Sequence, residues 1–303
     1  MKIQKLASTD GFIVFDLDGV DQAVGVVRLA PKILTDGASW LARSLTYRFA
    51  SFGLRIGGAS VGINANAEGR RAALDAFIGE VEPLVRSGQL LLEPGKGVAL
   101  DDLRPLVDAD PRGPDYFENH ERFLAAGVGA SAEVAAGGSL QGIAVAIEGV
   151  DLVAPELRDE LVQAGAEIVA ESPASTPEVA LGADAEIVIV GSKAGVVDHH
   201  SALGIKASAV VPWGPIPVTA KALALLRRRG VVVLPDFVTT AGPSIAPSGQ
   251  PPEIATAAVR ALVTAVLTEC RDHSAGQLLG ACERAEQFLR TWRAELPFGR
   301  PLA

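Results

Sequence analysis

The chain has 303 residues, a formal net charge of −9, 49% hydrophobic residues and 21% charged residues. This length and apolar content are enough for two buried cores, whereas the negative charge disfavours binding to nucleic acid. Charges, prolines and glycines interrupt each apolar run, so we expect no membrane span. Two cysteines and no leader-like start are typical of a cytoplasmic protein without a disulfide framework.

The first half is predicted to form a separate α/β domain. Apolar residues recur at helical spacing over residues 39–51 and again over residues 70–86. A glycine-rich passage, residues 53–62, lies between these two helices. The aromatic pair Tyr116 and Phe117 is interpreted as part of the core or of an interface.

The second half alternates short β-branched runs with amphipathic segments. Helices are predicted over residues 155–164 and 219–229, each stopped by a glycine. This alternation predicts a parallel, doubly wound sheet. The expected strands cover residues 144–148, 167–171, 186–190, 208–212 and 231–236.

The predicted domain boundary lies in a Gly/Ala-rich stretch, residues 125–142, that leads into the first of these strands. We expect one domain over residues 1–125 and a Rossmann-like domain over residues 126–275. Two last helices are predicted at residues 253–268 and 275–296. Residues 276–303 are expected to pack back on the first domain.

Three stretches carry a resemblance to a known family. They are LARSLTYRFASFGLRIGGASVGI at residues 41–63, LQGIAVAIEG at residues 140–149, and residues 209–245, which contain VVPWGP and RGVVVLPDFVTTAG. They resemble the substrate helix, the glycine-rich strand and the nucleotide-domain strands of the glutamate/leucine/phenylalanine/valine dehydrogenases. The resemblance implies an N-terminal substrate and oligomerisation domain followed by a Rossmann-like domain.

The residues that perform amino-acid oxidation in that family are altered here. The family uses a lysine to activate water and an aspartate to move protons. By resemblance, the lysine falls on Ser60 and the aspartate on Gly95, with Lys96 beside it. The lysine that holds the substrate carboxylate falls on Arg48, which keeps the positive charge. Arg48 is therefore either a carboxylate anchor or a partly buried helix residue paired to an acid.

The dinucleotide loop is altered as well. The family pattern Gly-x-Gly-x-x-Gly/Ala falls on residues 149–154, where Gly149 and Ala154 match and Asp151 replaces the middle glycine. Asp151 could occupy the place of a phosphate at the helix start, or it could simply cap the helix. Glu171 matches the acid that binds the ribose hydroxyls, and Thr240 replaces an asparagine. The resemblance thus implies either no NAD(P) binding or only weak binding.

Two further groups of residues could carry chemistry. Ser192 and Lys193 follow a strand at the edge where doubly wound sheets place ligands, so they are either a nucleophilic pair or exposed loop residues. Residues 198–200, Asp-His-His, could form a metal or acid/base cluster, or Asp198 could cap a helix. We expect no metal site.

Our first hypothesis is a repurposed dehydrogenase scaffold that does not oxidise amino acids with NAD. It would bind a small amino-acid-like carboxylate, or act on one without redox chemistry. The alternatives are a diverged NAD(P)-dependent reductase of imines or keto acids, and an inactive partner subunit of an active homologue. The resemblance also implies a homo-oligomer, or a hetero-oligomer with a homologue.

Overall fold

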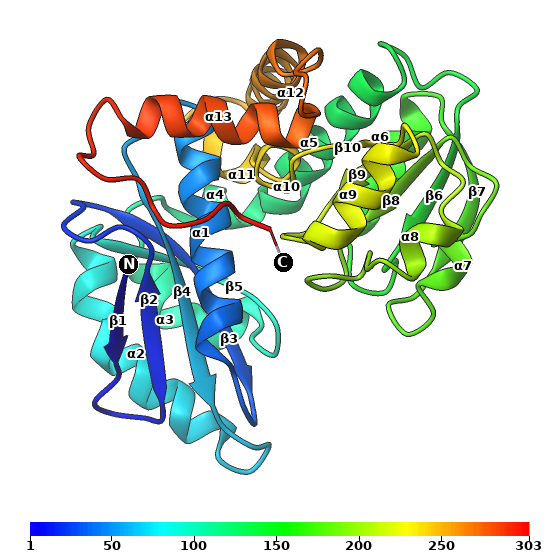
Figure 1. Cartoon of the computed structure of the whole chain (residues 1–303). Coiled ribbons are helices and arrows are strands. Elements are labelled where there is room, and N and C mark those ends of the chain that lie inside the picture. Colours follow the sequence, from blue (N-terminus) through cyan, green and yellow to red (C-terminus); the bar gives the residue numbers. More distant parts are fainter. Residues whose placement is uncertain (303) are drawn as a thin grey trace. The chain divides into compact units, whose positions relative to one another are not determined.

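The computed structural model describes residues 1–302 (Figure 1). The chain forms two compact units: unit 1 is Met1–Phe117 with Phe288–Pro301, and unit 2 is Glu118–Gln287 with Leu302. The first division lies a few residues before the expected boundary, because the Gly/Ala-rich stretch is largely helical, in α5 (His120–Ala135). The second lies near the end of α13 (Gln277–Leu289), which is shorter than the helix predicted there.

Unit 1 is built on a five-stranded sheet in the order β1-β2-β4-β3-β5. Strands β1, β2 and β4 pair in antiparallel fashion, whereas β3 is parallel to both β4 and β5. The strands are β1 (Lys2–Lys5), β2 (Gly11–Phe15), β3 (Ala23–Ala30), β4 (Gly57–Asn64) and β5 (Leu90–Pro94). The helices are α1 (Thr35–Ser51), α2 (Arg70–Arg86), α3 (Arg104–Ala109) and α4 (Pro114–Glu118), with a 3-10 turn η1 (Leu100–Leu103) before α3.

The two faces of this sheet are covered by different helices. Phe77 and Val81 of α2 pack against one face, in a core that also contains Val27 and Val61. Leu45 and Phe49 of α1 pack against the other face, with Val24 and Leu91. We call this second surface the α1 face. The predicted helices of residues 39–51 and 70–86 are thereby found, although α1 begins four residues earlier.

Helix α1 approaches β4 very closely at Gly58. A methyl group at this glycine would lie 1.8 Å from the carbonyl oxygen of Ala42 and 2.6 Å from the backbone nitrogen of Thr46. The Gly58 amide donates to the Thr46 hydroxyl at 3.0 Å, which fixes the contact. One glycine of the Gly-rich passage is therefore required by helix–strand packing.

We expect Gly58→Ala to destabilise unit 1 by about 2–3 kcal/mol, because both clashing atoms belong to the helix backbone and cannot rotate away. Gly79→Ala is the matched control, since nothing lies within 4 Å of a methyl group there. Urea unfolding of the three proteins measures the effect. Equal stability of the two variants would show that α1 and β4 are not packed as described.

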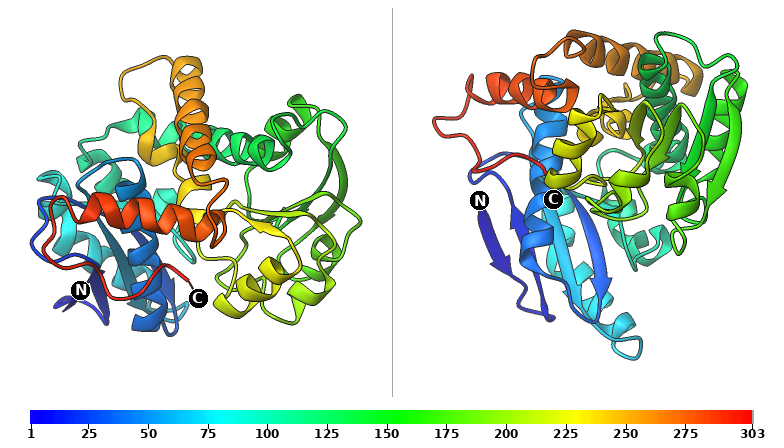
Figure 2. Two further views of the ribbon diagram at one scale, coloured as in Figure 1. Left: turned by 45° about the horizontal axis from the view of Figure 1, so that its top comes forward. Right: turned by 45° about the vertical axis from the view of Figure 1, so that its right-hand side comes forward.

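Unit 2 contains a parallel five-stranded sheet in the order β10-β9-β8-β6-β7 (Figures 1 and 2). The strands are β6 (Ala144–Glu148), β7 (Glu167–Ser172), β8 (Ile187–Val190), β9 (Ala209–Pro212) and β10 (Val232–Val233). The predicted doubly wound sheet is confirmed. The last strand is shorter than predicted, because Asp236 is the first residue of α10 (Asp236–Thr239).

Short crossover helices connect the strands of unit 2. They are α6 (Pro155–Gln163), α7 (Glu178–Leu181), α8 (Ser201–Gly204) and α9 (Ala220–Arg228). Helix α5 packs against α6, α11 (Gly242–Ile245) and α12 (Pro252–Glu269). The chain runs outward from β6 in both directions, so the order of strands reverses between β6 and β8. Ligands of doubly wound sheets bind outside the carboxyl ends of the strands at such a point.

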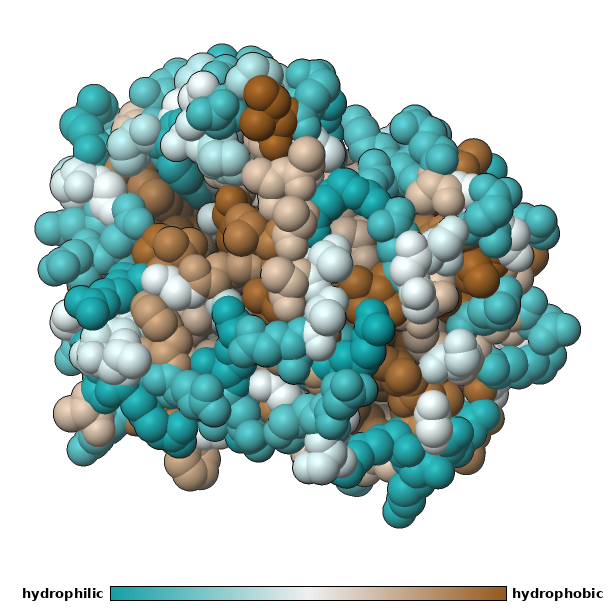
Figure 3. Space-filling model, turned by 90° about the horizontal axis from the view of Figure 1, so that it is seen from above, coloured by the Kyte–Doolittle hydropathy of each residue, from teal (hydrophilic) through white to brown (hydrophobic). Residues whose placement is uncertain are grey.

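Helix α12 is apolar on two sides. Val259 and Val263 are buried, whereas Ile254 and Leu262 are 56% and 44% exposed. A view from above shows apolar side chains among hydrophilic ones on the surface where this helix lies (Figure 3). Within residues 1–302, no helix is both long enough and apolar enough to span a membrane.

Candidate functional site

Polar residues form a row across three strands on the α1 face of unit 1. Val26 of β3 pairs with Ser60 of β4 on one side and with Glu93 of β5 on the other. Paired residues of neighbouring strands point to the same face, and Val26 packs with the α1 side chains. Ser60 and Glu93 are 0% and 6% exposed. A buried hydroxyl and a buried carboxylate therefore share this face.

Arg28 adds a guanidinium to the same face, two residues beyond Val26 on β3. Its Nη2 lies 3.4 Å from the hydroxyl of Ser60. Its Nε is buried and has no hydrogen-bond partner among residues 1–302. Burial lowers the pKa of Arg28, and no acidic neighbour in the described chain offsets this effect. A partly buried guanidinium with an unused donor is a site where an anion would be stabilising.

At the other end of the row, Tyr116 donates a hydrogen bond to the carboxylate of Glu93. Arg112 lies 3.4 Å from the same carboxylate, and its guanidinium stacks 3.9 Å from the Tyr116 ring centre. Arg112 is held in turn by Asp110, at 2.8 Å. Burial, followed by the charge of Glu93, raises the pKa of Tyr116 well above its ordinary value. Tyr116 therefore keeps its proton at neutral pH and can act as a hydrogen-bond donor.

Arg48 reaches this group from the last turn of α1, where it is 8% exposed. Its positive charge opposes part of the rise in the pKa of Tyr116. The structure thus connects Arg28, Ser60, Glu93, Tyr116 and Arg48 through one face of unit 1. With Arg112, this face holds three guanidinium groups and one phenol that donates to one carboxylate.

The turn after β5 leaves no room for a side chain at Gly95. A methyl group there would lie 2.3 Å from a methyl carbon of Val26 and 3.0 Å from the carbonyl oxygen of Val27. An aspartate at this position would require the turn to move. Lys96 is exposed, and its backbone carbonyl accepts from Leu29 at 2.9 Å. No described contact brings the Lys96 side chain to the polar row.

Sequence analysis missed Arg28, Glu93, Arg112 and Asp110. Arg28 and Glu93 each stand as a single charge inside an apolar strand, in the runs AVGVVRLA and LLLEP. A charge in a buried strand is destabilising unless it is paired or binds a ligand. This pattern in the sequence could therefore have indicated a functional site. Tyr116, which we interpreted as part of the core or of an interface, is the hydrogen-bond donor to Glu93.

At the carboxyl edge of the unit 2 sheet, neighbouring side chains pack against the loop that follows β6. Gly149 has φ +80°, and its amide donates to the carbonyl of Ser172 at 2.8 Å. A methyl group at Gly149 would lie 2.8 Å from the Trp213 ring and 2.9 Å from the Ser192 Cβ. Trp213 is fixed there, because its Nε1 donates to the carbonyl of Glu148 at 2.8 Å. Only a glycine therefore fits at this position.

Glu148 places a buried carboxylate at the same edge. It is 0% exposed, and its Oε2 accepts from the amides of Gly191 and Ser192 at 3.0 and 3.2 Å. Its Oε1 has no hydrogen-bond partner in residues 1–302, and neither has the hydroxyl of Ser172, the residue paired with it on β7. A negative charge here opposes phosphate binding.

We expect Glu148→Gln to stabilise unit 2 by about 1–2 kcal/mol, because it removes a buried charge. The amide oxygen keeps the bonds from Gly191 and Ser192, and the new NH2 group can donate to Ser172. Scanning calorimetry measures the shift, with exposed Glu186→Gln as the control, which we expect to change stability by less than about 0.5 kcal/mol. A lower melting temperature for Glu148→Gln would contradict the account of this site.

The other predicted cofactor residues are engaged within the protein. The Asp151 carboxylate accepts from the amide of Ala174 at 2.7 Å, and α6 has no side-chain cap hydrogen bond at its start. Ala154 precedes α6 and gives no side-chain cap. Glu171, which is exposed, pairs with Arg158 at 3.1 Å. The Thr240 hydroxyl donates to the carbonyl of Asp236 at 2.7 Å.

The remaining candidates are not assembled into a reactive group. Ser192 has a buried hydroxyl without a partner among residues 1–302, whereas Lys193 is exposed and no described contact joins the two. Asp198 accepts from the amides of His200 and Ser201 at 2.9 and 2.8 Å, which is a cap before α8. The hydrogen bond from Ser201 holds the pKa of Asp198 below its ordinary value. The described chain contains no group of three potential metal ligands.

Comparison with known sequences gives one short match. No family model matches the chain. An NADP-specific glutamate dehydrogenase from Saccharolobus shibatae is 33% identical over 85 residues. This match covers 27% of the chain and only 20% of the relative, well under two thirds of its length.

Solved structures are similar over almost the whole chain. A hetero-hexameric glutamate dehydrogenase from Thermus thermophilus has a TM-score of 0.73 at 20% identity, covering 94% of this chain and 86% of that one. An L-tryptophan dehydrogenase from Nostoc punctiforme has a TM-score of 0.69 at 18% identity, covering 96% and 95%. The fold is that of the amino-acid dehydrogenases. Together with the short sequence match, it supports the relationship to the glutamate/leucine/phenylalanine/valine dehydrogenase superfamily.

Proposed function

We propose that the chain binds an amino-acid-derived carboxylate on the α1 face of unit 1 and does not oxidise amino acids with NAD or NADP. The observation that supports this most is Arg28. Its guanidinium reaches the hydroxyl of Ser60, where the resemblance places a lysine, and keeps a buried Nε–H without a partner among residues 1–302. A carboxylate could accept from such a guanidinium in a fork of two parallel hydrogen bonds.

The neighbouring groups favour binding or non-redox chemistry. Arg48 supplies a second positive charge near the Tyr116 phenol, and Tyr116 is itself bonded to Glu93. Ser60 and Gly95 supply neither a base nor an acid of tuned pKa. Any chemistry on the bound ligand would therefore involve the Tyr116–Glu93 pair, in which the single phenol proton is donated to the carboxylate.

The proposal that NAD-dependent oxidation is absent rests on the carboxyl edge of unit 2. Trp213 packs on Gly149, and the Glu148 carboxylate takes the amides that follow β8. Incubation of the purified protein with NAD or NADP and each of the twenty amino acids tests it directly. We expect no reduced cofactor above background; turnover at about 1 s⁻¹ or faster with any amino acid would refute the proposal.

A diverged NADP-dependent reductase is the second candidate. Gly149 keeps the left-handed conformation of a dinucleotide loop, and the short sequence match is to a protein named as NADP-specific. Reduction of an already formed imine needs no lysine-activated water. Consumption of NADPH with a 2-oxo acid and ammonia would support this candidate, and its absence would remove it.

A partner-subunit role is the third candidate, and it is favoured by one relative. The Thermus glutamate dehydrogenase is described as hetero-hexameric. Co-purification of this chain with an active homologue from the native host would support that role. A stable homo-oligomer that binds a carboxylate by itself would count against it.

A further inference from the structure

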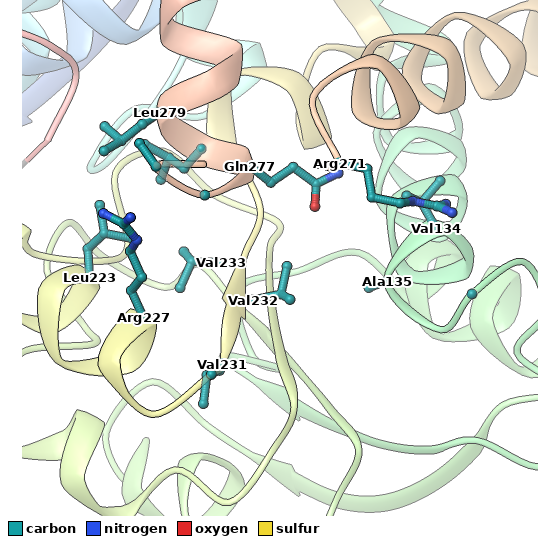
Figure 4. A pocket seen from close by; sticks show the side chains of 15 residues that line it. Val134, Ala135, Leu223, Arg227, Val231, Val232, Val233, Arg271, Gln277 and Leu279 are labelled. Carbon is teal, nitrogen blue, oxygen red and sulfur yellow. The ribbon is translucent and has the colours of Figure 1, made fainter. Parts of the chain in front are cut away.

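Unit 2 contains a pocket at the end of the sheet opposite to the loop of Gly149. It is formed beside the edge strand β10, by the end of α5, by α9 and by the start of α13 (Figure 4). Residues 230–233 line it at the beginning of β10, whereas Gly149 and Ser192 follow the ends of β6 and β8. Because all five strands are parallel, the pocket and the dinucleotide loop lie at opposite edges of the sheet.

The pocket is mainly apolar and has the size of a small-molecule site. Its volume is about 420 Å³, within the range of sites that hold small ligands. Val134, Leu223, Val232, Val233 and Leu279 supply apolar surface. An organic ligand with an apolar body would bury this surface.

The only charged side chains that line the pocket are two arginines, Arg227 and Arg271. Figure 4 shows them on either side of Gln277, above the valines of β10. Arg227 is held by the carbonyl of Ser274 at 2.8 Å, and Gln277 by the carbonyl of Leu267 at 2.7 Å. In the part of the chain described, neither arginine is paired with an acidic side chain.

Positive charge without an acidic partner is notable in a chain of net charge −9. Two guanidinium groups beside an apolar floor match a carboxylate that carries an apolar chain, since each group can donate to carboxylate oxygens. We propose that this pocket, which we call the β10 pocket, binds an apolar monocarboxylate. This site is separate from the one on the α1 face and does not depend on the proposed function.

The test is a calorimetric titration with hexanoate, hexanamide and hexylamine. It uses wild-type protein and an Arg28→Met variant, in which the site on the α1 face is disabled. We expect hexanoate to bind to both proteins. The Arg28→Met variant should bind hexanoate at least ten times more tightly than it binds hexanamide or hexylamine. No saturable binding of hexanoate to Arg28→Met, or equal binding of hexanamide, would overturn the proposal.

Substitutions in the Arg28→Met protein then locate the site. Arg271→Gln and Arg227→Gln should each weaken hexanoate binding about tenfold, and Val232→Trp should abolish it by filling the pocket. Arg228→Gln is the matched control, because Arg228 is exposed on α9 and does not line the pocket. Equal weakening by Arg228→Gln, or full binding by Val232→Trp, would place the hexanoate elsewhere and overturn the proposal. Failure of the α1-face proposal would appear separately, as identical binding of a 2-oxo acid by wild type and Arg28→Met.

Discussion

Arg28→Met should weaken binding of a 2-oxo acid or amino acid at the α1 face about 100-fold. The change removes a charged fork of donors that would bind the carboxylate in a partly buried setting, where such hydrogen bonds contribute more than at the surface. Calorimetry with pyruvate, 2-oxoglutarate, phenylpyruvate and leucine identifies the tightest ligand of the wild type. The same ligand is then titrated into the variant.

Two further variants distinguish specific hydrogen bonding of the carboxylate by Arg28 from an effect of the protein's net charge. Arg28→Lys keeps the charge but loses the fork, so we expect an intermediate affinity. Arg104→Met removes an exposed arginine, whose Nε lies 3.3 Å from Asp108, and should leave binding unchanged. If Arg104→Met weakens ligand binding as much as Arg28→Met does, the loss of affinity comes from net charge and the α1 face is not the binding site.

Asp16→Ala should destabilise unit 1 by about 4 kcal/mol, the largest single effect on stability that we expect. Asp16 Oδ1 accepts from Arg43 Nε at 2.7 Å, with side chains that are 0% and 8% exposed. Arg43 also donates to the carbonyls of Phe298 and Gly299. Removing the carboxylate leaves a buried guanidinium without its counter-charge and loosens the contact with the C-terminal segment.

Hydrogen exchange of peptides from β2 and α1 measures this loss within unit 1. The matched control is Asp75→Ala, which breaks an exposed pair with Arg71 at 3.0 Å and should cost less than about 0.5 kcal/mol. Combining Asp16→Ala with Arg43→Met should restore much of the stability, because no charge is then left buried. Equal protection in Asp16→Ala and Asp75→Ala would contradict the structure of this pair.

Much of the fold could be predicted from the sequence where hydrophobic periodicity is strong. The strand of residues 144–148 and the helix of residues 70–86 match β6 and α2 in full. The first three strands, β1, β2 and β3, were not predicted, because they alternate less clearly and lie among turns. Helix α5 was interpreted as a leading stretch, and its Gly127 and Gly129 are unfavourable in a helix interior.

The site on the α1 face was predictable only in part. Arg48 and Ser60 followed from the resemblance, and the structure connects both with the polar row. Arg28 and Glu93 come from strands whose neighbours could not be known without the sheet order β4-β3-β5. Tyr116 joins them from α4, more than twenty residues along the chain from Glu93. Contacts of this kind depend on register, which the sequence does not specify by itself.

At the carboxyl edge of unit 2, the structure reveals residues beside the loop after β6 that the glycine pattern did not indicate. Asp151 was interpreted as an occupant of a phosphate position or as a helix cap, and its carboxylate accepts from the amide of Ala174. Beside the same loop, the Trp213 indole packs on Gly149 and Glu148 places a buried carboxylate. Neither residue is part of the glycine pattern, so the pattern alone could not reveal them.

The most direct test of the central claim is one pair of calorimetric titrations of the wild-type protein, with NADPH and with the tightest 2-oxo acid. We predict saturable heat from the 2-oxo acid and none from NADPH up to about 1 mM. Saturable NADPH binding in the micromolar range, with no binding of any 2-oxo acid, would contradict it: the dinucleotide edge would then be the working site and the α1 face would not.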